Sequence, residues 1–442
     1  MRRADKNMTE RLLVKNIYVL GLLDWQRREL ETISNAERYR FHSLLTYEEL
    51  VEAHAGFDDL LERARKALRS SATPPDAIVC HWDFPSSCLA PVLARDFGLR
   101  APSLESVLRC EHKYWSRLEQ RKVVPECVPQ FQALDPYDPH AADRLELEYP
   151  IWLKPVKGFS SMLGFYIENR TQLKEALEQM REGIGELGKP FDECLAHVEL
   201  PPEVQGIGGR HALAESIMSG EQHAPEGYVL DGDVHIHGCF DMLRAQGGKS
   251  ISALRYPAEL DPEVEQRSAE VCRKVLNQVG FDNGCYNLEF LWDEQADKLW
   301  LIEVNTRISQ SHSELFRQVD GMSNHEVAVR VALGERPRLP EQRGPYSTAG
   351  KFLLNKVGDA EVVRVPDRDE VSRISRDLGD AFIDIDVEPG MRLSDLPNQA
   401  EYQYVVGEAW LGAQDSDELM SKYRNLIERI PFEFSDQRPL QP

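Results

Sequence analysis

Residues 285–307 read CYNLEFLWDEQADKLWLIEVNTR, and this acidic stretch decides the fold. Two apolar runs enclose the polar letters DEQADK, so the stretch predicts an antiparallel β-hairpin. If Trp292 pairs with Trp300, Glu289 falls directly opposite Glu303. The hairpin therefore predicts two carboxylates that face each other on one surface of a sheet.

The chemistry of this predicted face points to a metal ion. Two facing carboxylates repel each other unless a positive charge lies between them. Mg²⁺ (or Mn²⁺) takes oxygen ligands, commonly one or two carboxylates together with nucleotide phosphates. We predict that a divalent metal ion lies between Glu289 and Glu303, and that Arg307, on the same face as Asn305, stands ready to stabilise negative charge. The alternative is a solvated face on which Arg307 pairs with one glutamate.

A second candidate site is the segment KPVKGFSSMLG at residues 154–164. Its glycines permit a tight turn with exposed N–H groups, while Ser160 and Ser161 add hydroxyl donors and Lys154 adds a cation. Such a loop can bind polyphosphate. It matches neither G-x-x-x-x-G-K-[ST] nor G-x-G-x-x-G, and a flexible surface hairpin is the alternative interpretation.

The composition describes a large acidic protein of 442 residues, a length that suits about three domains. Its formal net charge of -22 repels nucleic acid and anionic membranes, so we expect neither as a partner. No apolar stretch approaches the roughly 18 residues that span a membrane, and the N-terminal run resembles a first strand rather than a signal peptide. The eight cysteines form no CxxC pair, which is typical of free thiols in a reducing cytoplasm. We therefore expect a cytoplasmic protein.

Three regions follow one another along the chain. Residues 1–110 alternate short apolar strands with helical patterns, which predicts a small α/β domain with βαβ order and a parallel sheet. Residues 111–340 mix helices with hairpins, one of them turning at Asp231-Gly232, and read as α+β. Residues 341–442 read as a small α+β domain that closes with an amphipathic helix.

The order of these features resembles the ATP-grasp superfamily, and within it the biotin-carboxylase-like carboxylate–amine ligases, such as L-amino-acid ligases. The resemblance covers nearly the whole length, and the E-V-N-T-R block at 303–307 is its most specific motif. It implies a preATP-grasp domain at 1–110, an ATP-grasp nucleotide-binding domain at 111–340 and a C-terminal lid domain at 341–442. It also implies ATP and Mg²⁺ (or Mn²⁺) as cofactors, with Glu289, Glu303 and Asn305 as the metal ligands and with Asn305 and Arg307 acting in catalysis.

The resemblance further implies a set of ATP contacts. Two lysines and a serine loop would meet the phosphates, a hinge segment would meet adenine and ribose, and a leucine would pack under the base. In that order, these residues are Lys113 and Lys154; Ser160 and Ser161; Glu215, Ile217 and His223; and Leu291.

The block that begins at Glu303 resembles the same block in biotin carboxylases. It differs from them at two positions that contact or deprotonate bicarbonate in those enzymes. Those enzymes have E-x-N-x-R-x-Q-V-E-H, whereas Ser309 stands here at the bicarbonate-contacting glutamine and Ser311 at the basic glutamate. Serine cannot act as a base at neutral pH, which disfavours carboxylation. The sequence therefore favours an ATP-dependent ligase that joins a small carboxylate to an amine, such as two amino acids, through an acyl phosphate, with release of ADP and phosphate. The alternatives are a carboxylase-like enzyme and a nucleotide-binding protein without turnover; a homodimer is expected by analogy alone.

Five further residues keep open roles. His235 and His237 share one face of a predicted strand, where structural or substrate-lining roles are favoured over metal binding because no third ligand is evident. Arg244, Lys249 and Arg255 are candidates to line the substrate pocket, since a carboxylate substrate needs a cation.

Overall fold

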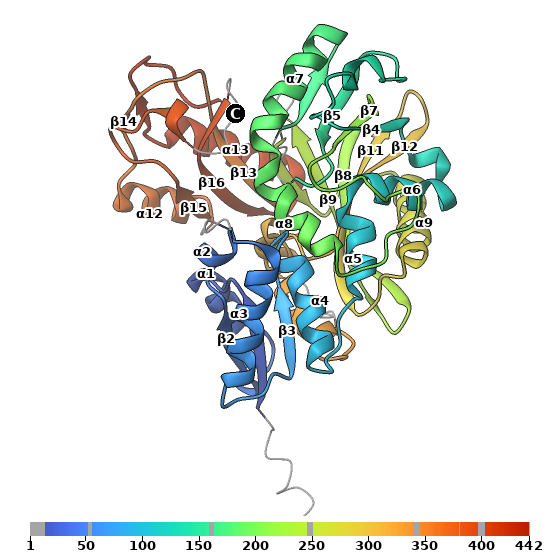
Figure 1. The fold of residues 1–442 in the computed structure, drawn as a ribbon. Coiled ribbons are helices and arrows are strands. Elements are labelled where there is room, and N and C mark those ends of the chain that lie inside the picture. The colour runs from blue at the N-terminus through green and yellow to red at the C-terminus, as the bar shows by residue number, and fades with distance from the viewer. Residues whose placement is uncertain are drawn as a thin grey trace, which may run out of the picture.

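The computed structural model shows three lobes in chain order, coloured blue, green to yellow, and orange to red in Figure 1. The residues that the structure describes are 14–51, 55–158, 163–244, 251–338, 344–379, 381–396 and 403–441. No helix within these ranges is both long enough and apolar enough to cross a membrane.

The N-terminal lobe is built on a three-stranded parallel sheet in the order β2-β1-β3. Its central strand is buried along the letters IYVL, so the helices cover both faces. The predicted βαβ order and parallel pairing are confirmed. The elements are β1 (Lys15–Leu20), α1 (Asp24–Glu31), β2 (Tyr39–Leu44), α2 (Tyr47–Val51), α3 (Phe57–Ser70), β3 (Ala77–Cys80) and α4 (Ser86–Asp96).

A smaller antiparallel sheet, in the order β4-β7-β5-β6, follows two linking helices. Its apolar face packs on helix α7 through a separate cluster of buried residues. The elements are α5 (Leu104–Glu111), α6 (Lys113–Val123), β4 (Phe131–Leu134), β5 (Ile151–Pro155), β6 (Phe165–Ile167), α7 (Arg170–Gly183), α8 (Gly185–Leu195) and β7 (Ala212–Ser216).

The largest sheet has eight strands in the order β12-β11-β8-β9-β10-β13-β16-β15. The predicted hairpin turn at Asp231-Gly232 is confirmed: both residues have positive φ, at 53° and 84°, as the tight turn between β8 and β9 requires. The elements of its first part are β8 (Glu221–Leu230), β9 (Asp233–Arg244), β10 (Ile251–Tyr256), α9 (Pro262–Val279), β11 (Gly284–Asp293), β12 (Lys298–Asn305), α10 (Ser313–Asp320) and α11 (Asn324–Ala332).

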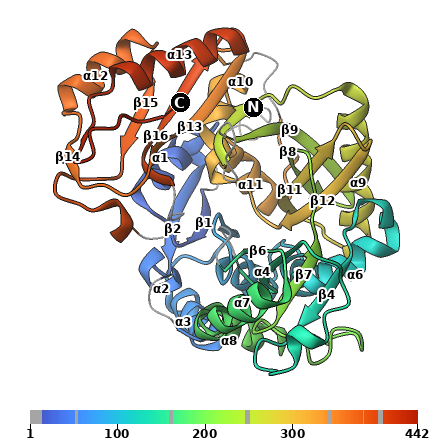
Figure 2. The same cartoon turned by 90° about the horizontal axis from the view of Figure 1, so that it is seen from above.

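The C-terminal lobe contributes three strands to the same sheet, because β13 pairs with β10 and then with β16. Strand pairing therefore runs across residue 340, and the division of the chain at that point stays a prediction. Figure 2 shows α12 and α13 on the outer side of β15 and β16, away from β1 and β2. The elements are β13 (Thr348–Val357), β14 (Val362–Arg364), α12 (Arg368–Asp377), β15 (Phe382–Ile385), β16 (Gln403–Ala413), α13 (Ser416–Arg429) and β17 (Glu433–Phe434).

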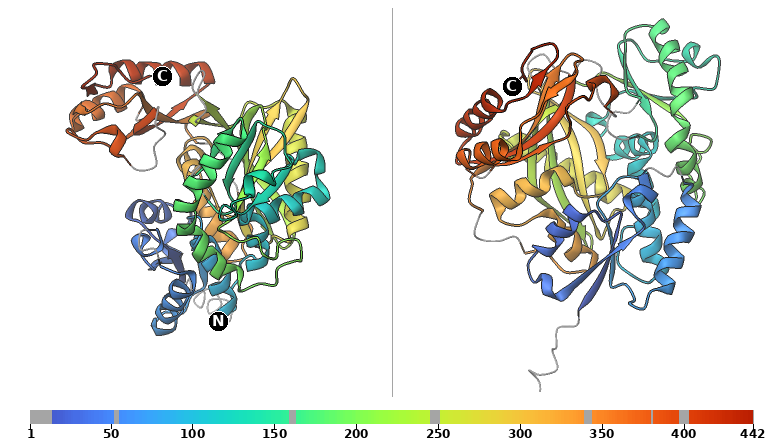
Figure 3. Two further views of the ribbon diagram at one scale, coloured as in Figure 1. Left: turned by 45° about the horizontal axis from the view of Figure 1, so that its top comes forward. Right: turned by 90° about the vertical axis from the view of Figure 1, so that its left-hand side faces the viewer.

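The lobes are arranged so that segments distant in sequence can form one site. In the left view of Figure 3, the N-terminal and C-terminal lobes lie on the same side of the middle region. The main hydrophobic core joins α3 and α4 of the N-terminal lobe to β11 and β12 of the acidic hairpin. This shared core fixes the first lobe against the hairpin.

Candidate active site

The acidic hairpin forms as the sequence predicts, with one difference in register. Glu289 pairs with Glu303, which confirms the facing carboxylates. The assumed partner of Trp292 is wrong, because Trp292 pairs with Leu299, and Trp300 pairs with Leu291. The register shifts by one residue just before Glu303, at a β-bulge on β12. The bulge compensates for the wrong starting pair, so the prediction for the two glutamates survives.

Glu289 is held by amides rather than by a cation. Asn305 Nδ2 donates to its Oε1 at 3.1 Å, and Gln222 Nε2 donates to its Oε2 at 2.9 Å. Burial, and after it the negative charge of Glu303, raises the pKa of Glu289 to about 7. A cation between the two carboxylates would favour the ionised form of Glu289 and oppose that shift.

Glu303, in contrast, already has a cationic partner. Lys113 Nζ lies 2.7 Å from Glu303 Oε1 and also donates to the carbonyl oxygen of Gly158 at 2.7 Å. Burial opposes ionisation of Glu303, but the charges of Lys113 and Lys154 outweigh it and hold its pKa below the usual value. Lys113 reaches this position because it is the first residue of α6. The two predicted lysines thus lie beside the acidic pair.

Glu215 joins the second lysine to a residue that sequence reasoning missed. Its fully buried carboxylate accepts from Lys154 Nζ at 2.8 Å and from Arg117 Nε at 2.5 Å. Arg117 also donates to the carbonyl oxygens of Leu301 and Ile302 at 2.6 and 2.8 Å. It therefore ties α6 to the bulged strand of the hairpin. The available signal was its spacing: four residues after Lys113 on a helix is the same face.

Arg307 binds a carboxylate from the N-terminal lobe. Its Nε donates to Asp83 Oδ1 at 2.8 Å and its terminal nitrogen donates to Oδ2 at 2.7 Å. This is a bidentate pair, the geometry in which guanidinium and carboxylate bind most strongly. Asp83 lies three residues beyond the end of β3. No sequence pattern indicated this contact, because the two residues are 224 positions apart.

His223 lies on the wrong face of its strand for the predicted ribose contact. Its ring stacks on Phe290, and its Nε2 bonds to Ser268 Oγ of α9 at 2.8 Å. Neighbouring side chains on a strand point to opposite faces, so the preceding Gln222 faces Glu289 instead. The structure does not support the prediction for His223 and places Gln222 at the acidic site.

The other predicted ATP contacts are placed as follows. Leu291 is buried and pairs across β11 and β8 with Gln222, on the side of the acidic residues. Ile217 is half-buried and directly follows β7. Ser160 and Ser161 lie outside the described residues, and so does Lys249.

The two remaining arginines have protein partners. Arg255 pairs with Asp241 at 2.5 Å and with Glu259 at 2.8 Å. Arg244 donates to Gln222 Oε1 at 3.0 Å, and Gln222 in turn donates to Glu289. Arg244 therefore belongs to the acidic site through one amide, whereas Arg255 is engaged with other carboxylates.

His237 lies beside a buried carboxylate behind the Arg307 loop. Its Nε2 is 3.9 Å from Glu226, which also binds His312 Nδ1 at 2.6 Å. His235 stacks on Tyr228 at 4.8 Å between ring centroids. Among the described residues no group of three His, Cys, Asp or Glu side chains could hold a metal ion. The acidic hairpin offers two carboxylates and an amide, and any further ligands there must come from a bound molecule or water.

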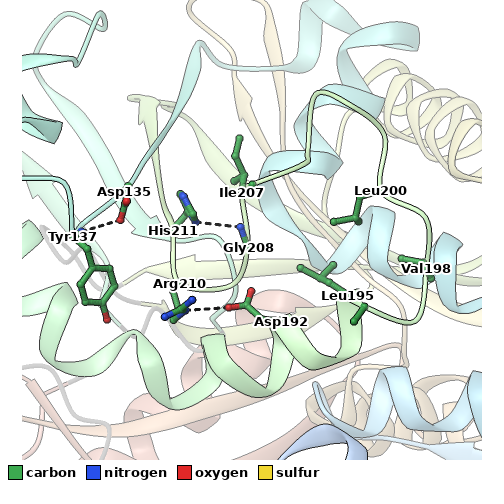
Figure 4. Close-up of a pocket in the computed structure, with 12 residues that line it drawn as sticks. Asp135, Tyr137, Asp192, Leu195, Val198, Leu200, Ile207, Gly208, Arg210 and His211 are labelled. Atoms are coloured by element: carbon green, nitrogen blue, oxygen red, sulfur yellow. Dashed lines mark hydrogen bonds and ion pairs between the residues drawn. The ribbon is translucent and has the colours of Figure 1, made fainter.

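A separate hollow of about 750 Å³ lies beside α8 and the segment that leads into β7 (Figure 4). Arg210 and Asp192 form an ion pair at 3.1 Å in its lining. The described side chains that line this hollow include none of the predicted ATP or metal contacts. The candidate active site is therefore the acidic hairpin with its lysines and arginines.

Comparison with known proteins agrees with this geometry. Residues 147–314 match the family model of the ATP-grasp domain. The chain carries an ATP-grasp domain. The matched segment begins just before β5 and extends past β12, so it includes Lys154, Glu215 and the whole acidic hairpin. The ATP-grasp domain thus contains both predicted sites.

The chain is similar to three proteins over different parts of its length. The uncharacterized protein y4rH of Sinorhizobium fredii is 24% identical over 305 residues, which are 67% of this chain and 56% of that protein. D-alanine–D-alanine ligase B of Chromobacterium violaceum is 27% identical over 207 residues, 46% of this chain and 61% of that ligase. The structure of L-amino acid ligase from Bacillus licheniformis has a TM-score of 0.70 and 16% identity, covering 95% of this chain and 99% of that one. The last similarity confirms the fold, and the chain spans little more than half of the first two relatives.

Proposed function

We propose that this protein is an ATP-dependent ligase that joins a small carboxylate to an amine through an acyl phosphate and releases ADP and phosphate. The observation that carries the proposal is the facing pair of Glu289 and Glu303, with Lys113 and Lys154 beside it. The ligase names of two similar proteins, D-alanine–D-alanine ligase and L-amino acid ligase, support it.

The donor set fits Mg²⁺. Glu289, Glu303 and Asn305 offer only oxygen ligands that a hard divalent cation accepts. Burial and the nearby charge of Glu303 raise the pKa of Glu289, and a bound cation would oppose both effects. Bound there with ATP, Mg²⁺ would neutralise charge on the phosphate oxygens.

The other residues supply binding and charge stabilisation. Lys113 and Lys154 offset phosphate charge, and Arg117 holds Glu215 so that Lys154 keeps its position. Arg307 stabilises the oxyanion that forms when the nucleophile attacks the acyl phosphate. We also propose that the protein acts in the cytoplasm, because its eight cysteines are free thiols.

The test is phosphate release from Mg-ATP with the twenty amino acids, alone and in pairs. Glu303→Ala should lower any release by at least about 100-fold, the scale on which one catalytic electrostatic group acts. Glu294→Ala, on the exposed turn of the same hairpin, is the matched control and should leave the rate unchanged. Tight Mg-ATP binding without release by any carboxylate or amine would instead favour a nucleotide-binding protein without turnover.

A further inference from the structure

Amide formation from an ammonium substrate needs a base, and one of the carboxylates around Arg307 is a candidate for that base. Among the described residues, the carboxylates that act most on the charge of Arg307 are Asp83, Glu111 and Glu289. Glu289 belongs to the proposed metal site. Glu111 is buried in an ion pair with Lys157. Asp83 is the carboxylate of these three that neither role uses.

The histidines near the Arg307 loop do not offer an alternative base. His312 is 2% exposed and is bonded to Glu226 behind the loop. His81, two residues before Asp83, is 1% exposed and packs edge-on against His325. Neither ring can meet a substrate without a rearrangement of the core.

Asp83 combines access with the correct position. Its side chain is 28% exposed and that of Arg307 is 18% exposed, so a small molecule can reach the pair. Asp83 follows the carboxyl end of β3 in a parallel sheet, the edge at which open α/β sheets bind ligands. It also fills the fork of the guanidinium, where the oxyanion would form.

We propose that Asp83 is the general base that deprotonates the attacking amine, an inference that rests on the proposed ligase function. The carbonyl oxygen of the acyl phosphate, on which the oxyanion then develops, displaces the Asp83 carboxylate from Arg307 and leaves it beside the carbon under attack. The Arg307 guanidinium thereby binds the Asp83 carboxylate first and the oxyanion afterwards.

The loss of its bonds to Arg307 also makes Asp83 a stronger base when the amine is bound. Burial alone would raise the pKa of Asp83, but Arg307, with smaller effects from Lys157 and Lys113, holds that pKa below its usual value. When Arg307 turns to the carbonyl oxygen of the acyl phosphate, before the amine attacks, its effect on Asp83 weakens and the carboxylate binds a proton more readily.

Amide formation transfers two protons from nitrogen, one to Asp83 and one to the leaving phosphate. Asp83 takes one proton from R–NH₃⁺, and the nitrogen electron pair forms the C–N bond. The carbonyl π pair moves to oxygen, beside Arg307, and then returns as the C–O bond to phosphate breaks. Phosphate leaves with the electrons of that bond and takes the second nitrogen proton. The products are the amide, hydrogen phosphate and protonated Asp83, which releases its proton to solvent.

Hydroxylamine separates this role from a structural one, because it is neutral at pH 7 and attacks acyl phosphates without prior deprotonation. Asp83→Asn should lower amide formation by at least about 100-fold while hydroxamate formation falls less than about 10-fold, as loss of a general base requires. Asp76→Asn, which removes another ion-paired aspartate of the same lobe, is the control and should change neither rate. Asp83→Glu keeps a carboxylate and should recover part of the amide rate.

Each other outcome overturns the proposal. Equal loss of amide and hydroxamate in Asp83→Asn would mean that Asp83 only positions Arg307, and an unchanged amide rate would mean that another group takes the proton. If Asp83→Asn does not fold, Asp83→Glu must still slow amide formation more than hydroxamate formation, since it moves the carboxylate. Absence of hydroxamate from the wild type with every carboxylate tested would overturn the ligase function itself, and the proposal with it.

Discussion

Replacing Glu215 by glutamine removes a buried carboxylate that two cations share. Arg117 Nε and Lys154 Nζ lie 2.5 and 2.8 Å from its two oxygens, and the side chain is 0% exposed. Burial raises the pKa of Glu215, but Arg117 and then Lys154 outweigh it and lower that pKa to about 2. Glutamine has nearly the same shape as glutamate, but it leaves Arg117 and Lys154 buried without the negative charge that they share.

The expected loss of stability follows from the lowered pKa of Glu215. The pKa falls from 4.5 to about 2, and each unit corresponds to about 1.4 kcal/mol, so ionised Glu215 stabilises the fold by about 3 kcal/mol. Burial lowers the pKa of Lys154 by more than Glu215 raises it, so the lysine offsets part of this gain. Removing one partner of a buried pair costs about 3–5 kcal/mol in other proteins. We expect Glu215→Gln to lower the free energy of unfolding by about 3 kcal/mol at pH 7.

The sign of the pH dependence is determined by the lowered pKa. The contribution of Glu215 is fully present above its unfolded pKa of 4.5 and is lost as the pH falls toward about 2. The difference in unfolding free energy between wild type and Glu215→Gln should therefore be constant above about pH 5 and shrink below it. Other carboxylates titrate equally in both proteins and cancel in the difference.

The assay is urea unfolding followed by tryptophan fluorescence. Trp152 pairs directly with Glu215 across β5 and β7, so its emission reports on this sheet. Asp297→Asn, which breaks an exposed pair with Arg267, is the control and should cost less than about 1 kcal/mol. A loss below about 1 kcal/mol in Glu215→Gln, or a difference that does not shrink at acid pH, would refute the reasoning.

Two further changes test the site itself. Gln222→Ala removes a donor to Glu289 and should raise the Mg²⁺ concentration needed for half-maximal phosphate release by about 10–100-fold, whereas His223→Ala should leave that concentration unchanged. An equal increase in both variants would contradict the role of Gln222, and a raised KM for ATP in His223→Ala would support the ribose prediction. Glu226→Gln weakens the bonds to His312 and to the Ser309 N–H behind Arg307, and should lower kcat by up to about 100-fold with little change in the KM for ATP. Steady-state kinetics decide the second case, and a change confined to KM would contradict it.

Much of the site was predictable because its patterns are local. Alternation along one strand places Glu303 and Asn305 on one face, and the short hairpin brings Glu289 opposite Glu303. By the same rule His223 lies on the opposite face from Gln222, since a shift of one residue moves a side chain to the other face of a strand. A resemblance can therefore place a segment on its strand and leave open which of two neighbouring side chains faces the site.

Strand alternation and turn chemistry act over a few residues, so the class of fold, the facing carboxylates and Lys154 could be predicted from the sequence, whereas Lys113 was implied by the resemblance to the ATP-grasp superfamily. The contacts through which Arg117 joins Lys154 by way of Glu215, and Asp83 fills the fork of Arg307, appear in the folded protein alone. These contacts join segments separated by 98 and 224 residues, and packing of one lobe against another creates them. No periodic pattern within either segment records which distant side chain it will meet.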